Sequence, residues 1–497
     1  MIDQRFLMKK NCKNILLGIF TLCVLVGLVQ IYKDLPDGIS IEGAPHEVSV
    51  DDITFLSDVT YLDEDGVRVS EQEIFPEIYT MIEEANAYIL IDMFLFNDML
   101  GASTESYKSL SSELTQKLVE KKRSTPEIEI TFITDPINTV YGGDTSAHIT
   151  QMQQAGIRVI MTDLTKLRDS NPLYSAPWRV FGQWWGNSTD GGWLPHVMDA
   201  RREKLTLRTY LRLFNFKANH RKVVMSDYRK KGGSGYGVLV TSANPHDGSS
   251  AHSNVALRID TALWQDAYLS EQVVADFSGE FVPAPPILEN MDTRELSESE
   301  QRATVRLLTE GKIKDDLLRE INMSTASEEI DMMMFYLSDR DIVKALKEAA
   351  SRGVKIRMIL DPNKDAFGRE KNGIPNRQIA HEIAQHSENA NIRWCNTHGE
   401  QCHSKITLFK RGLSTTVVMG SANLTRRNIG DYNLETNVIV QSPTQSQVID
   451  EATAFFDTHW ENQDGREYTL DYNAYSDDNK LRIILYRFME ATGLSSF

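Results

Sequence analysis

The feature that most constrains the fold of this 497-residue chain is a layout that occurs twice. Residues 219–247 read NHRKVVMSD…VLVTSANPHD, and residues 402–428 read CHSKITLFKRGLSTTVVMGSANLTRRN. In each, a His-x-Lys triplet opens a short apolar strand, and a second strand ends in Ser-Ala-Asn. Residues i and i+2 of a strand share a face, so the histidine and the lysine should point the same way. The repeat therefore predicts two equivalent phosphate-sized pockets, made by His220, Lys222 and Asn244 and by His403, Lys405 and Asn423.

The repeat extends beyond these strands. Ile91-Asp92-Met93 and Ile330-Asp331-Met332 lie in apolar runs of the buried-strand type, each followed by a helical pattern and a second strand that ends in Asp-Pro. The second helical pattern ends at Gly353, a residue typical of a helix C-terminus. Alternating strands and helices predict an α/β fold. We expect two tandem copies of one domain, over residues 54–280 and 301–463, each a mixed β-sheet flanked by helices.

The two copies differ by one insertion. From Arg158 to His220 the chain advances 62 residues, whereas from Arg393 to His403 it advances 10. The extra segment, residues 161–213, should overhang the strand that carries His220. It contains four of the seven tryptophans: Trp178, Trp184, Trp185 and Trp193. These rings are expected either in a packed lid over the site or at a water–lipid interface, where indoles are favoured.

The N-terminus predicts a membrane anchor. The run from Ile15 to Ile31 carries no charge and would form a helix about 26 Å long, enough to cross a bilayer with interfacial help. Basic residues precede it, so residues 1–33 should be a cytoplasmic tail and transmembrane helix, with the remaining mass exported. Residues 34–53 would then form a stalk. A cleaved signal peptide is the competing interpretation, although no Ala-x-Ala site follows.

The other segments carry less information. Residues 281–300 contain three prolines within a short stretch and suit an extended linker, and residues 464–497 should form a helical tail. The net charge of −17, with no basic block, disfavours nucleic acid as a partner. Cys395 and Cys402 lie in the exported part and are compatible with a disulfide, with two free thiols, or with a zinc set that includes His398 and His403.

The duplicated motif resembles that of the phospholipase D superfamily, in which HxKxxxxD is followed by GSxN in each of two halves. The resemblance implies a pseudo-twofold arrangement in which both halves contribute to one site. Asp227 matches the motif aspartate, which is structural in the family, whereas Lys410 stands at that position in the second copy.

Roles follow from the resemblance residue by residue. His220 would be the nucleophile that forms a phosphohistidine, and His403 the general acid and later the base. Lys222, Lys405, Asn244 and Asn423 would hold the phosphate, and Glu435 would orient His220. The partner that should orient His403 is in doubt, because His252 occupies the place of the expected acid, with Asp247 and Asn254 as substitutes.

The resemblance implies a metal-independent enzyme that needs no cofactor and acts on phospholipids of a membrane. It would be a phospholipase D or a phosphatidyltransferase similar to cardiolipin synthases, because hydrolysis and transfer share the phosphohistidine and differ in the acceptor. Two alternatives remain: a membrane-anchored exonuclease of the same superfamily, and an inactive scaffold that binds phosphorylated ligands.

Overall fold

Two mixed sheets with the same strand order account for the duplicated sequence. The computed structural model describes residues 4–495 except 104, 106, 233, 288–295 and 298. The first sheet runs, edge to edge, β3 (Arg68–Glu71), β2 (Ile53–Leu62), β9 (Asn254–Asp260), β8 (Gly237–Thr241), β7 (Lys222–Ser226), β4 (Tyr88–Met93), β5 (Glu129–Thr134) and β6 (Arg158–Met161). The second runs β1 (His46–Ser49), β10 (Arg302–Thr309), β18 (Thr436–Pro443), β17 (Ser414–Gly420), β16 (Lys405–Arg411), β11 (Glu329–Met334), β12 (Lys355–Leu360), β15 (Ala390–Cys395) and β19 (Thr469–Asp471).

The order from β2 to β6 repeats from β10 to β15. In both sheets three neighbouring strands are parallel, β4–β5–β6 and β11–β12–β15, and the HxK strand pairs antiparallel with the first of them. The predicted fold class, two mixed-sheet α/β halves, is confirmed.

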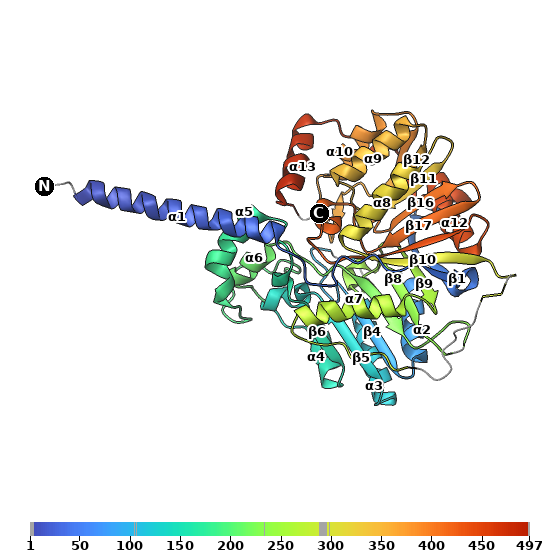
Figure 1. Cartoon of the computed structure of the whole chain (residues 1–497), viewed down its shortest axis with the longest axis horizontal. Coiled ribbons are helices and arrows are strands. Elements are labelled where there is room, and N and C mark those ends of the chain that lie inside the picture. The colour runs from blue at the N-terminus through green and yellow to red at the C-terminus, as the bar shows by residue number, and fades with distance from the viewer. Residues whose placement is uncertain are drawn as a thin grey trace.

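Helices cover the outer face of each sheet (Figure 1). The first half uses α2 (Ile74–Glu84), α3 (Leu110–Ser124) and α4 (Ala147–Gln154), and the second uses α8 (Gly311–Met323), α9 (Arg340–Ser351) and α10 (Asn376–Ala384). In β4, Ile89 and Ile91 face the outer core, whereas Tyr88 and Leu90 face the opposite side. Both faces of this strand are buried, which explains its uninterrupted apolar run.

The inner faces of the two sheets share one core. Val223 and Met225 of β7 belong to the same buried cluster as Ile406 and Leu408 of β16. Helices α7 (Trp264–Phe277) and α12 (Gln447–Glu461) contribute to it from the two halves. Because this core is continuous, the two HxK strands are packed in one shared hydrophobic core.

Helix α9 shows how local sequence sets the element ends. Asp339 precedes the helix and accepts the backbone N–H groups of Asp341 and Ile342 at 3.1 and 3.2 Å, as an N-cap residue does. Gly353 follows the last turn with φ +94°, a conformation that favours glycine. The predicted helix end at Gly353 is confirmed.

The strand register corrects one sequence overlay. Met93 lies opposite Lys222, and Met334 lies opposite Lys405. Asp92 and Asp331, aligned by their shared Ile-Asp-Met letters, are therefore two positions apart in the two sheets. Because the offset is two, both carboxylates still lie on the same face of their strands, and local letters alone do not reveal the shift.

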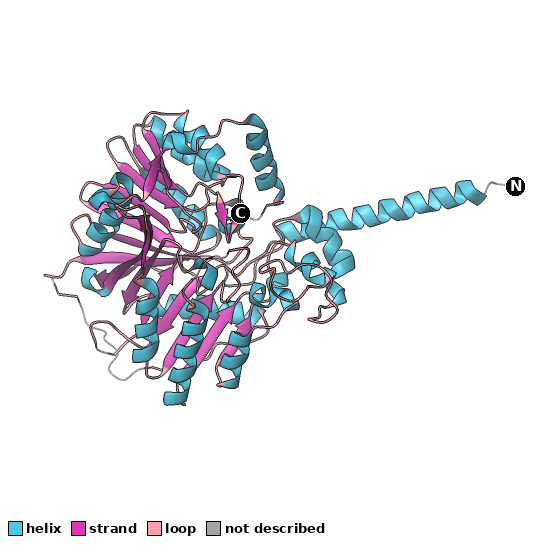
Figure 2. Cartoon of the chain, turned by 180° about the vertical axis from the view of Figure 1, so that it is seen from behind, coloured by secondary structure: helices cyan, strands magenta, loops and turns pink. Residues whose placement is uncertain are grey.

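The N-terminal helix α1 (Gln4–Tyr32) projects from the body (Figure 2). Its stretch Asn11–Tyr32 is long and apolar enough to cross a membrane, by length and composition. The segment expected to be a stalk instead adds an edge strand to the second sheet. β1 pairs with β10, and Gly43 donates its N–H to the Leu307 carbonyl at 2.8 Å.

The insertion forms α5 (Pro172–Pro177), α6 (Leu207–Leu213) and short helical turns between them. Helix α5 packs on the last turns of α1, where a Cβ on Gly27 would lie 3.4 Å from that of Ala176. In the tail, Thr469–Asp471 completes the second sheet and α13 (Lys480–Thr492) packs beside it. Within the expected linker 281–300, residues 288–295 and 298 lie outside the described residues.

Candidate active site

Each motif histidine is held by backbone from the opposite half. The His220 N–H donates to the Leu434 carbonyl at 2.9 Å, and the His403 N–H donates to the Ser253 carbonyl at the same distance. The predicted pseudo-twofold relation is therefore visible at the level of single hydrogen bonds. Neither half alone can position its own histidine in this way.

The ring nitrogens are also held across the interface. His220 Nδ1 lies 2.9 Å from Glu435 Oε2, and His403 Nδ1 lies 3.1 Å from Asn254 Oδ1. Ser421 and Asn428 also donate to the Glu435 carboxylate. In the first half, Asn254 takes the corresponding place, held by Ser242 at 3.0 Å.

The other two candidates for orienting His403 have different contacts. Asp247 accepts the Ser111 N–H and hydroxyl at 2.9 and 2.7 Å, so it belongs to the start of α3. His252 lies beside His403, with ring centroids 5.7 Å apart, and stacks on Phe367.

Both histidines and both motif asparagines line one cavity of about 370 Å³, here called the histidine cleft. The Asn244 carbonyl oxygen accepts the Leu95 N–H at 3.3 Å, which leaves its amide NH₂ as a donor. Since Nδ1 of each histidine is taken, Nε2 is the ring atom left for a ligand.

The motif lysines lie one layer below this surface. Lys222 and Lys405 are fully buried, and each Nζ donates to the carbonyl of its own motif histidine at 2.7 Å. Each ammonium also lies 5.3 Å from the centroid of an aromatic ring, Phe94 or Phe335. The structure therefore brings histidines and asparagines to the cleft and places the lysine charges beneath them.

Burial in the cleft disfavours the positive charges of its own side chains. Burial, opposed by Glu435, lowers the pKa of His220 to about 4. Burial and the charge of Lys405 hold the pKa of His403 well below its usual value. Burial lowers the pKa of Lys222 to about 7, against the pull of Glu435. An anion in the cleft would reverse these shifts, because opposite charge favours the protonated forms.

The motif aspartate Asp227 binds backbone groups at the start of β4. Asp227 accepts the backbone N–H groups of Asn86, Ala87 and Tyr88 at 3.0, 2.9 and 3.1 Å, and so closes the turn into β4. In the second half Lys410 makes no such turn, because it pairs instead with Glu329 at 3.2 Å and with the buried Asp331.

Two further pairs at the site were not singled out from the sequence. Asp135 accepts the Asn219 N–H at 2.7 Å, and Asp361 accepts the Cys402 N–H at 2.9 Å, so each holds the residue before a histidine. The Asp-Pro pair, which occurs at the same place in both halves of the sequence, could have indicated these two aspartates. Phe94 and Phe335 pack on the histidine rings, with centroids 4.7 and 4.9 Å apart.

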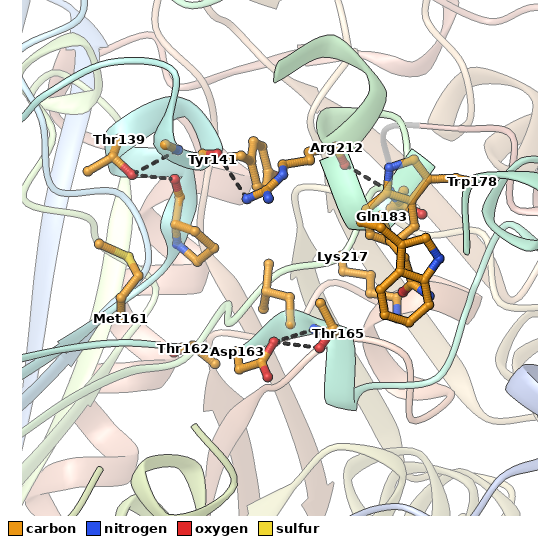
Figure 3. A pocket seen from close by; sticks show the side chains of 15 residues that line it. Thr139, Tyr141, Met161, Thr162, Asp163, Thr165, Trp178, Gln183, Arg212 and Lys217 are labelled. Atoms are coloured by element: carbon orange, nitrogen blue, oxygen red, sulfur yellow. Dashed lines mark hydrogen bonds between the residues drawn. The ribbon is translucent and has the colours of Figure 1, made fainter. Parts of the chain in front are cut away.

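The insertion forms a second cavity of about 420 Å³, here called the side cavity (Figure 3). Trp178 and Trp184 lie on its wall, opposite the turn Pro136–Gly142. Trp184, Trp185 and Trp193 are 76, 55 and 64% exposed, so these three rings are not core anchors. Tyr141 and Lys217 line both the side cavity and the histidine cleft, which makes the cavities neighbours.

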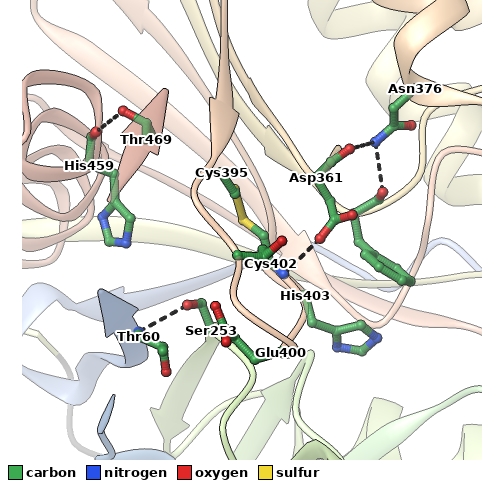
Figure 4. The surroundings of a disulfide bond; sticks show 12 residues. Thr60, Ser253, Asp361, Asn376, Cys395, Glu400, Cys402, His403, His459 and Thr469 are labelled. Carbon is green, nitrogen blue, oxygen red and sulfur yellow. Dashed lines mark hydrogen bonds between the residues drawn. A yellow bond between two sulfur atoms is a disulfide. The ribbon is translucent and has the colours of Figure 1, made fainter. Parts of the chain in front are cut away.

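Cys395 and Cys402 form a disulfide directly before His403 (Figure 4). It closes the short connection from β15 to the HxK strand, which in the first half is replaced by the insertion. Because both sulfurs are bonded to each other, they cannot form the zinc set considered above. Among the described residues, no group of three or more metal-binding side chains is found.

Comparisons with known proteins agree with this geometry. The family model described as "Cardiolipin synthase, PLD-like domain" matches residues 317–460. The fold is similar to that of phosphatidylserine synthase from Haemophilus influenzae Rd KW20, with 10% identity, coverage of 91% of this chain and 96% of that chain, and a TM-score of 0.53. A search of the curated proteins found no match.

Two other solved structures are more distant. Polyphosphate kinase from Porphyromonas gingivalis is 12% identical over 89% of this chain and 56% of that chain, with a TM-score of 0.41. The phospholipase D family member Nuc from Salmonella typhimurium is 23% identical over 34% of this chain and 98% of that chain, with a TM-score of 0.27.

The fold and the site together define a class: two-half α/β proteins whose paired HxK strands meet in one cleft. The family model "Cardiolipin synthase, PLD-like domain" matches the second of these halves, over residues 317–460, and the first half repeats its motif and strand order.

Proposed function

We propose that this protein transfers or hydrolyses the phosphatidyl group of membrane phospholipids, without a metal, through a phosphohistidine on His220. The observation that carries the proposal is the pair of histidines in one cleft, each with Nδ1 bound across the interface, which leaves Nε2 as the ring nitrogen for a ligand. Such a pair supplies the nucleophile and the proton donor that phosphodiester exchange requires.

In the proposed reaction, Nε2 of His220 attacks phosphorus while the bond to the headgroup oxygen breaks. His403 gives its proton to the leaving alkoxide. His403 then removes a proton from the acceptor, water or an alcohol, whose oxygen displaces His220. The amides of Asn244 and Asn423 hold phosphate oxygens, and Lys222 and Lys405 stabilise the developing charge from below. The bound phosphate raises the pKa of His403, which provides the protonated acid.

The difference between the two partners supports the order of these roles. Glu435 carries a carboxylate and can stabilise the positive charge that His220 gains on becoming phosphorylated. Asn254 is neutral and leaves His403 the more readily deprotonated of the two. This suits the role proposed for His403, which first donates a proton to the leaving group and then, once deprotonated, accepts one from the acceptor.

The surface around the base of α1 supports a lipid substrate. Large apolar side chains are exposed on the insertion and on α13, on the side of the body from which α1 projects (Figure 1). These are Leu173, Phe181, Trp184, Trp185 and Trp193 on the insertion, and Leu481, Ile484, Leu485 and Phe488 on α13. Arg427 links the two surfaces by contacting Ser170 and the Gly493 carbonyl. Exposed apolar surface of this kind is characteristic of membrane contact.

The test is to trap the intermediate. Purified protein is mixed with a phospholipid labelled in its phosphate and denatured within one turnover. Labelled phosphohistidine at position 220 is expected, absent in His220→Ala and longer-lived in His403→Ala with a good leaving group. Each substitution should lower turnover by about 10⁴-fold, and the double variant should be little worse. Label on His403 would reverse the roles, and activity in the double variant would overturn the mechanism.

A further inference from the structure

The side cavity carries an inference about how the lipid is held, and it rests on the proposed function. Its wall carries the apolar side chains of Pro136, Met161, Leu164, Trp178 and Trp184, beside polar ones that include Asp163, Gln183 and Arg212. Figure 3 shows Met161 and Trp178 on this wall. Its volume of about 420 Å³ lies within the range of ligand cavities, roughly 300–1,000 Å³. Nothing in the phosphoryl chemistry described above requires this cavity.

The side cavity and the histidine cleft adjoin at a defined point. Tyr141 and Lys217 line both, so they lie at the boundary between the two spaces. Lys217 is held there by a buried ion pair with Asp169, at 2.6 Å, and Asp169 also binds Arg179 of the insertion. His220 follows Lys217 by three residues. The insertion is thus fastened to the segment that leads to the nucleophile.

The boundary between the two cavities includes a strained turn. Val140 and Tyr141 adopt φ of +44° and +56° and are followed by Gly142 at +79°, three left-handed residues in succession. Non-glycine residues in this region cost free energy and persist where the surroundings demand them. Here the turn places Tyr141 between the two cavities. Arg212 on α6 lines the side cavity near this point, and its guanidinium donates to the Tyr141 carbonyl at 3.4 Å.

The cavity also lies where lipid would arrive. Its Trp178 and Trp184 belong to the insertion that packs on the end of α1 through α5. Asp169 donates its N–H to the Gln30 carbonyl of α1 at 3.1 Å, and Arg168 donates to the Lys33 carbonyl at 2.8 Å. The insertion that forms the cavity therefore contacts the predicted anchor, and the cavity itself borders the histidine cleft.

We infer that the side cavity binds an acyl chain of the phospholipid whose phosphate lies between His220 and His403. The chain runs past Tyr141 and Lys217, and the guanidinium of Arg212 faces the ester oxygens at this boundary. Chain length is then recognised by the protein and not only by the bilayer. Each methylene buried should improve affinity by about fourfold until the cavity is full.

The experiment compares kcat/KM over a homologous series of short-chain phosphatidylglycerols, all kept below their aggregation concentration. In the wild type, kcat/KM should rise with chain length and then level off. Gln183→Trp adds an indole to the cavity wall and reduces its volume. In this variant kcat/KM should therefore level off at a shorter chain length, and kcat/KM for the longest chain should be about 10-fold lower than in the wild type. Gln153→Trp places the same residue on the exposed side of α4 and is the matched control. A chain-free aryl phosphodiester should be cleaved equally by all three proteins.

A second measurement uses only the wild-type protein. A phosphatidylglycerol with a photoreactive group at the end of one chain, bound to the wild type, should label the turn 136–142 and the insertion. Wild-type turnover of lipids with no chain-length slope, equal slopes in the two tryptophan variants, or labelling confined to other segments would each overturn the inference alone. Cleavage of the chain-free substrate with no turnover of any lipid would overturn the proposed function as well.

Discussion

At the scale of single residues, the partners of the two histidines differ in charge. Asn254 accepts from His403 where Glu435 accepts from His220. We predict that Asn254→Asp raises the pKa of His403, because a carboxylate favours imidazolium, by about 1 unit or more. A general acid acts when protonated, so the alkaline limb of the kcat profile should move to higher pH. Asn254→Ala should lower kcat without that shift. Matched pH profiles of the three proteins decide the point, and an unmoved limb in the aspartate variant would contradict it.

Lys410 gives a second residue-scale prediction. It pairs with the buried Asp331, which Arg357 also binds at 2.7 Å. Lys410→Met should destabilise the fold by about 1–3 kcal/mol, because one charge partner of a buried carboxylate is lost while the other remains. Lys410→Asp, which restores the family motif, should cost more, since it adds a third carboxylate beside Glu329 and Asp331. Denaturant unfolding measures both. A Lys410→Asp variant more stable than the wild type would contradict the stabilising role of Lys410 beside Asp331.

At the scale of elements, the insertion separates membrane contact from packing. Trp184 lines the side cavity, so the cleaner pair for this question is Trp185 and Trp193, both more than half exposed. Replacing both by alanine should leave the melting temperature and chain-free turnover unchanged and should lower activity on vesicles several-fold. The control is Trp394→Ala. The Trp394 ring is fully buried and its Nε1 donates to the Tyr472 carbonyl, so this substitution should lower the free energy of unfolding by about 3–5 kcal/mol. Equal losses on both substrates would argue against a membrane role for the pair.

The elements also show what the sequence could and could not predict. The HxK strands were predictable because their alternation and the Ser-Ala-Asn endings are local and occur twice. Glu435 was expected from the resemblance to the phospholipase D superfamily and not from the repeat, because His252 stands at the corresponding place in the first copy. The role of Asn254 was only one of several options, because it depends on contact with the opposite half. The offset between Asp92 and Asp331 depends on strand register, which paired strands decide together. β1 was missed because His46–Ser49 has no partner nearby in the sequence.

At the scale of the whole molecule, orientation relative to the membrane remains a prediction. Four basic residues precede the apolar run, so the body should lie outside the cytoplasm. Protease added to sealed spheroplasts should digest the body and leave a membrane-bound fragment of α1. Inverted vesicles, as the control, should protect the body until they are lysed. The reverse pattern would contradict the predicted orientation, and the disulfide would then lie in a reducing compartment.

The edge strand β1 bears on the order in which the chain can fold. Its neighbour Ile41 donates its N–H to the Thr309 hydroxyl, 268 residues later in the sequence. During synthesis the segment after α1 therefore stays unpaired until the second half has been made. The cleft likewise cannot form before Leu434 and Glu435, which bind His220, have been synthesised. An anchor-free protein that begins at residue 54 would leave the β10 edge open, and exposed strand edges promote association. One that begins before Ile39 should stay monomeric at concentrations where the shorter protein aggregates, which light scattering can compare.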